Sequence, residues 1–192
     1  MRCWLVVMLL LSTGVANSQQ QKEERTFPAK DQVQLLLTQS ERAFDAYEQV
    51  LKLETQVGGD LARTVTKDRG SLTAARALLA RLKERPEGFN GPVGFLLVGN
   101  LDDGTRDMSV CMGQAGVQSG IQALAGNASE GQRYVGLAQA CGDASTLLYT
   151  VSETAFNMYS QFLLAQDEMT TKAASSLERC VNILKENQQQ RQ

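Results

Sequence analysis

The chain has 192 residues, of which 43% are hydrophobic, and its 19 basic and 21 acidic side chains give a net charge of −2. It has no basic block and no row of aromatic and basic residues, so we expect no binding to nucleic acid. It also has no histidine, which removes the commonest general base and the commonest ligand of transition metals. We therefore expect a non-catalytic protein with no metal site and no cofactor.

Residues 1–18 have the composition of a secretory signal peptide. Arg2 supplies a positive charge, the apolar stretch from Trp4 to Leu11 is too short to cross a bilayer, and small residues stand at the usual cleavage offsets. We expect cleavage before Gln19 and secretion into an oxidising, extracellular environment. No later apolar run reaches the roughly 18 residues of a membrane span, so no membrane insertion is expected after signal removal.

The mature chain is expected to form one helical domain over residues 30–187. The preceding residues 19–29 are polar, charged and without periodicity, which indicates a disordered tail. Residues 188–192 are a second polar tail. Within the domain, residues 30–57 carry apolar side chains in seven-residue columns, a broad stripe that is typical of a helix in a bundle. Two glycines at 58 and 59 should end this helix.

The next helix is expected over about residues 60–85, and an irregular connection over residues 86–104. This connection contains five glycines and two of the three prolines of the chain. Long loops in compact domains often carry function. The alternative is a structural role, in which this stretch forms an apolar plug over the end of the bundle. The apolar residues that would serve as ligand or partner loop, or as plug, are Phe89, Val93, Phe95, Leu96, Leu97 and Val98.

Residues 105–125 predict a further helix, and the sequence starting at Ser129 fits a capping box that begins another. From residue 137 to residue 165, apolar side chains alternate in steps of four and three without a slip. This regularity favours one long helix through Gly142. In the alternative, Gly142 ends one helix and the aspartate after it caps the next.

A last hairpin near Asp167 is expected to fold residues 167–187 back onto the bundle. The apolar residues expected to face inward on this helix are Ala173, Leu177, Cys180, Val181 and Leu184. The predicted fold is therefore all-α, a bundle of four to six amphipathic helices with one long central loop rich in glycine and proline.

Three cysteines remain after signal removal. Cys111 and Cys141 each lie 15 residues from Gly126 in the turn between two helices, so they are level in an antiparallel hairpin and are expected to form a disulfide. Cys180 has no partner within reach. It is either a buried free thiol on the apolar stripe or an intermolecular link that would make a homodimer.

Asn127 begins the sequence Asn-Ala-Ser, an acceptor for N-glycosylation. The helix pattern places it in the exposed turn between two helices. We therefore expect a glycan at this end of the bundle.

Our first functional hypothesis is a secreted, non-catalytic protein that acts by extracellular protein–protein interaction, through a helical face or the loop at 86–104. The alternative is an extracellular carrier that holds a small apolar ligand within the bundle, beneath residues 95–98. A hydrolase that works with carboxylates alone is a third hypothesis, placed behind both.

Overall fold

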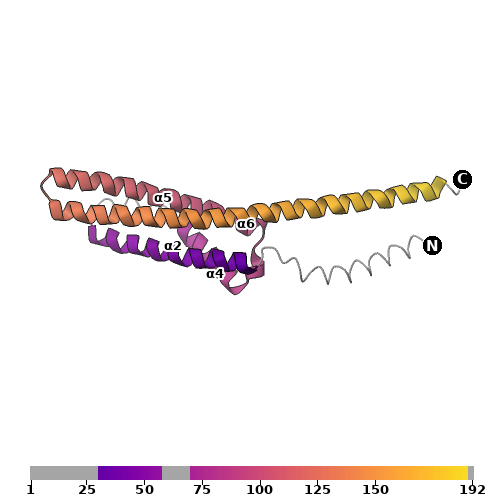
Figure 1. The fold of residues 1–192 in the computed structure, drawn as a ribbon, viewed down its shortest axis with the longest axis horizontal. Helices are drawn as coiled ribbons and strands as arrows, with labels where there is room; N and C mark the ends of the chain where they lie inside the picture. The colour runs from indigo at the N-terminus through magenta and orange to yellow at the C-terminus, as the bar shows by residue number, and fades with distance from the viewer. Residues whose placement is uncertain (1–29, 58–69, 190–192) are drawn as a thin grey trace.

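The computed structural model describes residues 30–57 and 70–189, with side chains described as far as Arg179 and again at Asn182. These residues form four α-helices and one 3₁₀ turn, with no strand among them (Figure 1). The elements in chain order are α2 (Lys30–Val57), α4 (Gly70–Glu84), η2 (Pro86–Gly88), α5 (Gly91–Leu124) and α6 (Ala128–Gln189).

The predicted all-α class is thus confirmed for the described part of the chain. None of the helices described there has an apolar stretch long enough to cross a membrane. The signal peptide, the tail at 19–29, the glycine stop at 58–59 and the first part of the helix expected from residue 60 all lie outside the described residues.

Helices α5 and α6 form a long antiparallel hairpin (Figure 1). The hairpin turns at Gly126, whose φ of +78° is a conformation that glycine adopts without steric cost. The N–H of Asn127 donates to the carbonyl of Gln122, and the N–H of Gly126 donates to that of Ala123. These two bonds satisfy the last carbonyl groups of α5 in the usual manner of a glycine-terminated helix.

Helix α2 packs along α6 and runs antiparallel to it (Figure 1). Gln32 at the start of α2 donates to Gln161, while Thr154 donates to Gln39 further along. The shorter α4 packs mainly on α5. The core between the helices is apolar and includes Leu36, Val50, Leu72, Leu82, Leu97, Leu101, Met108, Leu137, Leu148 and Val151, all at most 2% exposed.

The long helix through Gly142 is confirmed. A Cβ at residue 142 would lie 3.1 Å from Sδ of Met112, so this glycine makes room for a side chain of α5 within a continuous helix. The predicted stripe supplies most of the buried face of α6, with Leu137, Cys141, Ala144, Leu148, Val151, Ala155 and Met158.

The irregular connection expected over residues 86–104 is reduced to a few residues, because α5 already begins at Gly91. Asn90 caps the helix, since its side-chain oxygen accepts from the N–H of Val93 at 3.0 Å. Pro92 stands in the first turn, where its missing N–H costs nothing. A count of glycine and proline missed this helix because two of its glycines, Gly94 and Gly104, serve close packing against other helices.

The hairpin expected near Asp167 is wrong. Helix α6 continues without a turn to Gln189 and projects beyond the other helices (Figure 1). Ala173 and Leu177, expected to face inward, are exposed. Helical periodicity shows which side chains share a face, but it does not show whether another helix covers that face.

Candidate interaction surface

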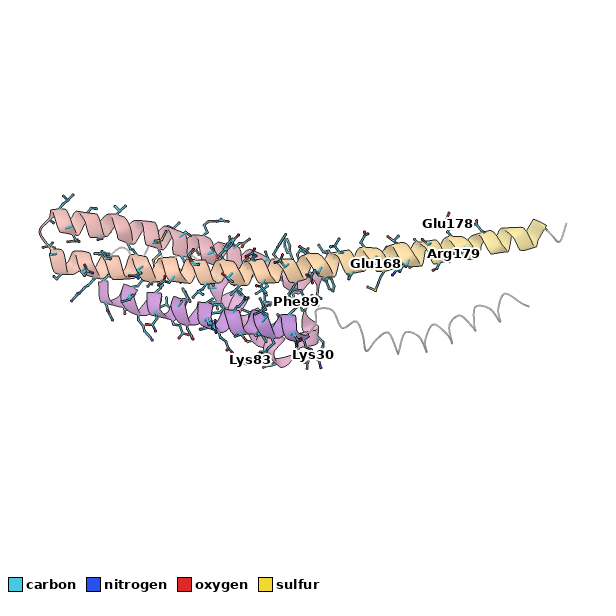
Figure 2. The ribbon with its side chains drawn as sticks, in the orientation of Figure 1. Lys30, Lys83, Phe89, Glu168, Glu178 and Arg179 are labelled. Atoms are coloured by element: carbon cyan, nitrogen blue, oxygen red, sulfur yellow. A yellow bond between two sulfur atoms is a disulfide. The ribbon has the colours of Figure 1, made fainter. Side chains whose placement is uncertain are left out.

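The apolar residues of the expected loop are divided between the core and the surface. Phe89 and Leu97 are 2% and 0% exposed, whereas Phe95 and Leu96 are 65% and 52% exposed. Val93 and Val98 are half-buried and pack against the core. The plug interpretation therefore fits Phe89, at the end of the bundle (Figure 2). Phe95 and Leu96 are available at the surface.

Phe95 belongs to an exposed group of large side chains on α5 and α6. Its ring centroid lies 6.4 Å from that of Tyr159, at an interplanar angle of 57°. On α6, Phe156 and Leu163 lie one turn before and one turn after Tyr159, on the same side of the helix, and they are 53% and 44% exposed. We call these four residues the aromatic patch.

The approach of Tyr159 to α5 depends on Gly94. A Cβ at residue 94 would lie 3.0 Å from Cδ2 of Tyr159 and 3.1 Å from Cζ of Phe89. Both contacts are tighter than ordinary packing, so the lack of a side chain at Gly94 lets these two rings close over the helix. This role of the glycine could not be predicted from the sequence, because the packing partner Tyr159 lies far away in the chain.

Beyond the aromatic patch, none of the other described helices lies beside α6 (Figure 1). Gln32 of α2 contacts Gln161, and a Cβ at Gly91 of α5 would lie 3.3 Å from Phe162. Both neighbours therefore begin at the level of residues 161–162. The remaining residues 163–189, here called the α6 extension, form a single helix about 40 Å long at 1.5 Å per residue.

The α6 extension keeps the apolar face of the bundle. Five helical turns contain 18 residues, so Ala173 is in line with Ala155, and Leu177 is in line with Tyr159. Ala155 is 0% exposed, and Tyr159 packs against the core. Leu177, by contrast, is 68% exposed. The same helical face is thus covered in the bundle and uncovered in the extension.

Charged side chains occupy other sides of the extension. Lys172 and Glu168 form an ion pair one turn apart, with Nζ 2.6 Å from Oε1. Figure 2 shows Glu168, Glu178 and Arg179 along the extension, away from the rest of the bundle. An amphipathic helix of this kind gains most of its stability from packing of its apolar face, since isolated helices are marginal in water.

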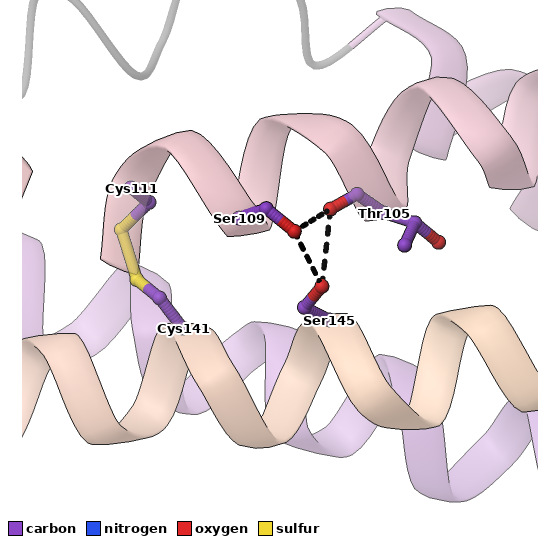
Figure 3. Close-up of a disulfide and its surroundings, with 5 residues drawn as sticks. All are labelled: Thr105, Ser109, Cys111, Cys141 and Ser145. Atoms are coloured by element: carbon purple, nitrogen blue, oxygen red, sulfur yellow. Dashed lines mark hydrogen bonds between the residues drawn. A yellow bond between two sulfur atoms is a disulfide. The ribbon is translucent and has the colours of Figure 1, made fainter. Parts of the chain in front are cut away.

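A disulfide and a group of hydroxyls hold α5 and α6 in register (Figure 3). Cys111 and Cys141 are bonded, with Cα atoms 5.9 Å apart, which is the predicted pairing. Nearby, the hydroxyl oxygens of Ser109 and Ser145 lie 2.9 Å apart, and each lies within hydrogen-bond distance of the carbonyl oxygen of Thr105, at 3.0 and 3.2 Å, so that their two hydrogens are shared among the three contacts. These hydroxyls are engaged with backbone and with each other, which indicates a structural role.

A groove lies between α2 and α4. Its cavity of about 210 Å³ is lined by Leu37, Ser40, Glu41, Phe44, Asp45, Arg76, Leu79, Ala80 and Lys83. Arg76 pairs with Glu48 and lies 5.0 Å above the ring of Phe44, and Lys83 pairs with Glu41 at 2.9 Å. Ion pairs thus connect the two helices across the groove.

These ion pairs shift two pKa values. The hydrogen bond and the charge of Arg76 lower the pKa of Glu48, and the hydrogen bond and the charge of Glu41 raise the pKa of Lys83. All four side chains are about half exposed or more, so solvent screens the pairs. The groove shows the features of a charged helix–helix contact.

Two further predicted sites lie at opposite ends of α6. Asn127 is exposed in the turn, as expected, and its amide nitrogen donates to Gln122 at 2.9 Å; its glycosylation stays a prediction. Cys180 lies on the α6 extension, but its side chain is outside the described set, so neither interpretation of this thiol is decided. The described residues contain no group of three or more side chains that could hold a metal ion.

No model of a known protein family matches the chain, and no curated protein or solved structure is significantly similar to it. Its function must be inferred from its own residues. The largest unexplained feature among the residues described is the α6 extension with the adjoining aromatic patch.

Proposed function

We propose that this protein is a secreted, non-catalytic helical protein that acts by protein–protein interaction, and that it binds through the α6 extension. The observation that carries the proposal is the exposure of Leu177. This leucine lies on the helical face that packs into the core at Ala155, yet 68% of it is exposed. Covering an exposed leucine stabilises an assembly by about 1.5–3 kcal/mol.

The aromatic patch supports the same proposal. Phe95, Phe156 and Leu163 are exposed where the bundle ends and the extension begins. Large aromatic side chains are enriched in protein interfaces, where they often contribute most of the binding energy. The patch and the extension are continuous along α6, so one partner can cover both.

The carrier hypothesis receives less support. It required residues 95–98 to cover a ligand, but these residues form a turn of α5 in which Phe95 and Leu96 are exposed. We therefore propose interaction with a protein rather than transport of an apolar ligand.

Site-specific photo-crosslinking tests the proposal. A photoreactive phenylalanine analogue is placed at Leu177, or in a matched variant at Leu124, which is 92% exposed at the other end of the hairpin. The mature protein is irradiated in the medium of the cells that secrete it. We expect a discrete protein adduct from position 177 and none from position 124. The absence of an adduct at 177, or equal adducts at both positions, would contradict the proposal.

A further inference from the structure

We propose that the partner of the α6 extension is a second copy of this chain, whose own extension packs against it in the antiparallel direction. This inference rests on the proposed function and names the partner. Each copy would cover the apolar face of the other, and the contact would be the same on both sides of a twofold axis.

The uncovered face of the extension can accommodate one further helix. The apolar face of α6 is covered by α2 and α5 up to residues 161–162, where both of those helices begin. A helix that continues their packing must therefore end against the bundle, and it must be about 40 Å long to cover residues 163–189. The α6 extension of a second copy is a helix of that length.

No further helix among the described residues is free to cover this face. Lys30 lies at the end of the bundle from which the extension projects (Figure 2), and of the sequence before it only residues 19–29 remain after the predicted signal cleavage. Their sequence, QQQKEERTFPA, contains Phe27 as its single large apolar residue. Such a segment does not bury enough apolar surface to compensate for its ordering.

The direction follows from the position of the bundles. In a parallel pair both bundles would lie at the same end, where each α6 face is already occupied by its own α2 and α5. In an antiparallel pair the bundles lie at opposite ends, and each free helix end meets the bundle of the other copy. The antiparallel pair therefore avoids the clash.

The apolar spacing selects a register. Placing Ala173 opposite Leu177 of the second copy also places Leu177 opposite the second Ala173, so that a small and a large side chain face each other in two layers about the axis. In this register residue 188 of one copy is level with Phe162 of the other. Helix α6 ends at Gln189, so its length matches the space up to the start of α2 and α5.

Charge opposes this assembly only weakly. The extension contains four acidic residues, Asp167, Glu168, Glu178 and Glu186, and three basic residues, Lys172, Arg179 and Lys185. Each copy therefore contributes a net charge of −1, which is weakly repulsive at physiological ionic strength.

The first test is the mass and shape of the mature protein in solution. Helix α6 has 62 residues and is therefore about 93 Å long. Two antiparallel copies that overlap by about 40 Å span about 145 Å, whereas a parallel pair spans about 95 Å. We expect light scattering to give twice the mass of one chain and small-angle X-ray scattering to give the longer dimension. A monomer, or a dimer of the shorter dimension, would overturn the inference.

Paired variants identify the surface. Leu177→Glu should give a monomer, whose extension loses part of its helicity because its apolar face is no longer covered, and Leu124→Glu should leave the dimer intact. Both leucines are exposed, so in both variants the bundle should still unfold cooperatively when followed by circular dichroism. A dimer that persists in Leu177→Glu would overturn the inference.

The crosslinking experiment separates this inference from the proposed function. An adduct at position 177 with twice the mass of the chain supports both. An adduct with a different protein, in a chain that is monomeric, leaves the proposed function in place and overturns the second copy as partner. A monomer without any adduct contradicts both.

Discussion

Gly104 of α5 and Leu72 of α4 touch so closely that a Cβ on residue 104 would overlap Cδ2 of the leucine and lie 2.7 Å from its Cγ. Leu72 is 2% exposed, so it has little room to move. This contact fixes how closely α4 approaches α5, and it exists because residue 104 has no side chain.

Gly104→Ala is therefore expected to destabilise the bundle, although alanine favours helix. Displacing Leu72 is expected to lower the free energy of unfolding by about 1–3 kcal/mol. The better helix propensity of alanine raises it by at most about 1 kcal/mol. Gly113→Ala is the matched control, since no atom lies within 4 Å of its Cβ position, and it should stabilise by up to about 1 kcal/mol. Urea denaturation measures both. Equal stability of the two variants would show that Leu72 yields freely.

The two phenylalanines at the start of α5 should differ strongly on truncation. Phe89→Ala removes a side chain that is 2% exposed, and we expect a loss of about 3–5 kcal/mol in the free energy of unfolding. Phe95→Ala removes a ring that is 65% exposed and contacts Tyr159, so a loss of at most about 1 kcal/mol is expected. Thermal unfolding followed by circular dichroism compares them. Similar losses would mean that Phe89 does not close the bundle.

Loss of the disulfide is expected to weaken the hairpin without unfolding it. Cys111 and Cys141 are 30 residues apart in sequence, and removing a bond that closes such a loop typically costs about 2–4 kcal/mol. The double variant Cys111→Ala/Cys141→Ala should therefore unfold at lower denaturant concentration than the oxidised protein. Adding a reductant should destabilise the wild type and leave the double variant unchanged. An effect of the reductant on the double variant would point to Cys180.

The stability of the α2–α4 contact is expected to fall in acid. Arg76 lowers the pKa of Glu48 from its usual 4.5. A group whose pKa is lower in the folded state stabilises above its unfolded pKa, and this contribution is lost as the pH falls through the folded value. Glu48→Gln should therefore show a flatter decline of the unfolding temperature below about pH 5. Matching acid profiles for the two proteins would contradict this assignment.

At alkaline pH the other ion pair should weaken instead. Glu41 raises the pKa of Lys83 above its usual 10.5, so this pair stabilises below that value and is lost as the pH rises through the folded pKa. Lys83→Met should lose this alkaline dependence when unfolding is followed between pH 9 and 12. Both pH effects are expected to be small because the side chains are exposed.

Three features were predictable from sequence periodicity and spacing: the helical class, the long apolar stripe of α6 and the pairing of Cys111 with Cys141. These features depend on the helical period and on the number of residues from a turn. Neither depends on which other helices pack nearby. The helix at residue 91 was missed for the opposite reason. The glycines of that stretch are explained by contacts with Tyr159 and Leu72, which are distant in sequence.

Which parts of the apolar stripe are covered depends on the packing of the other helices. Ala155 and Ala173 are equivalent on the wheel of α6, yet the first lies in the core and the second in the uncovered extension. The sequence predicted a hairpin near Asp167 because an apolar face requires burial. Whether burial comes from the same chain depends on where α2 and α5 begin, and a helical pattern contains no information about the length of its neighbours.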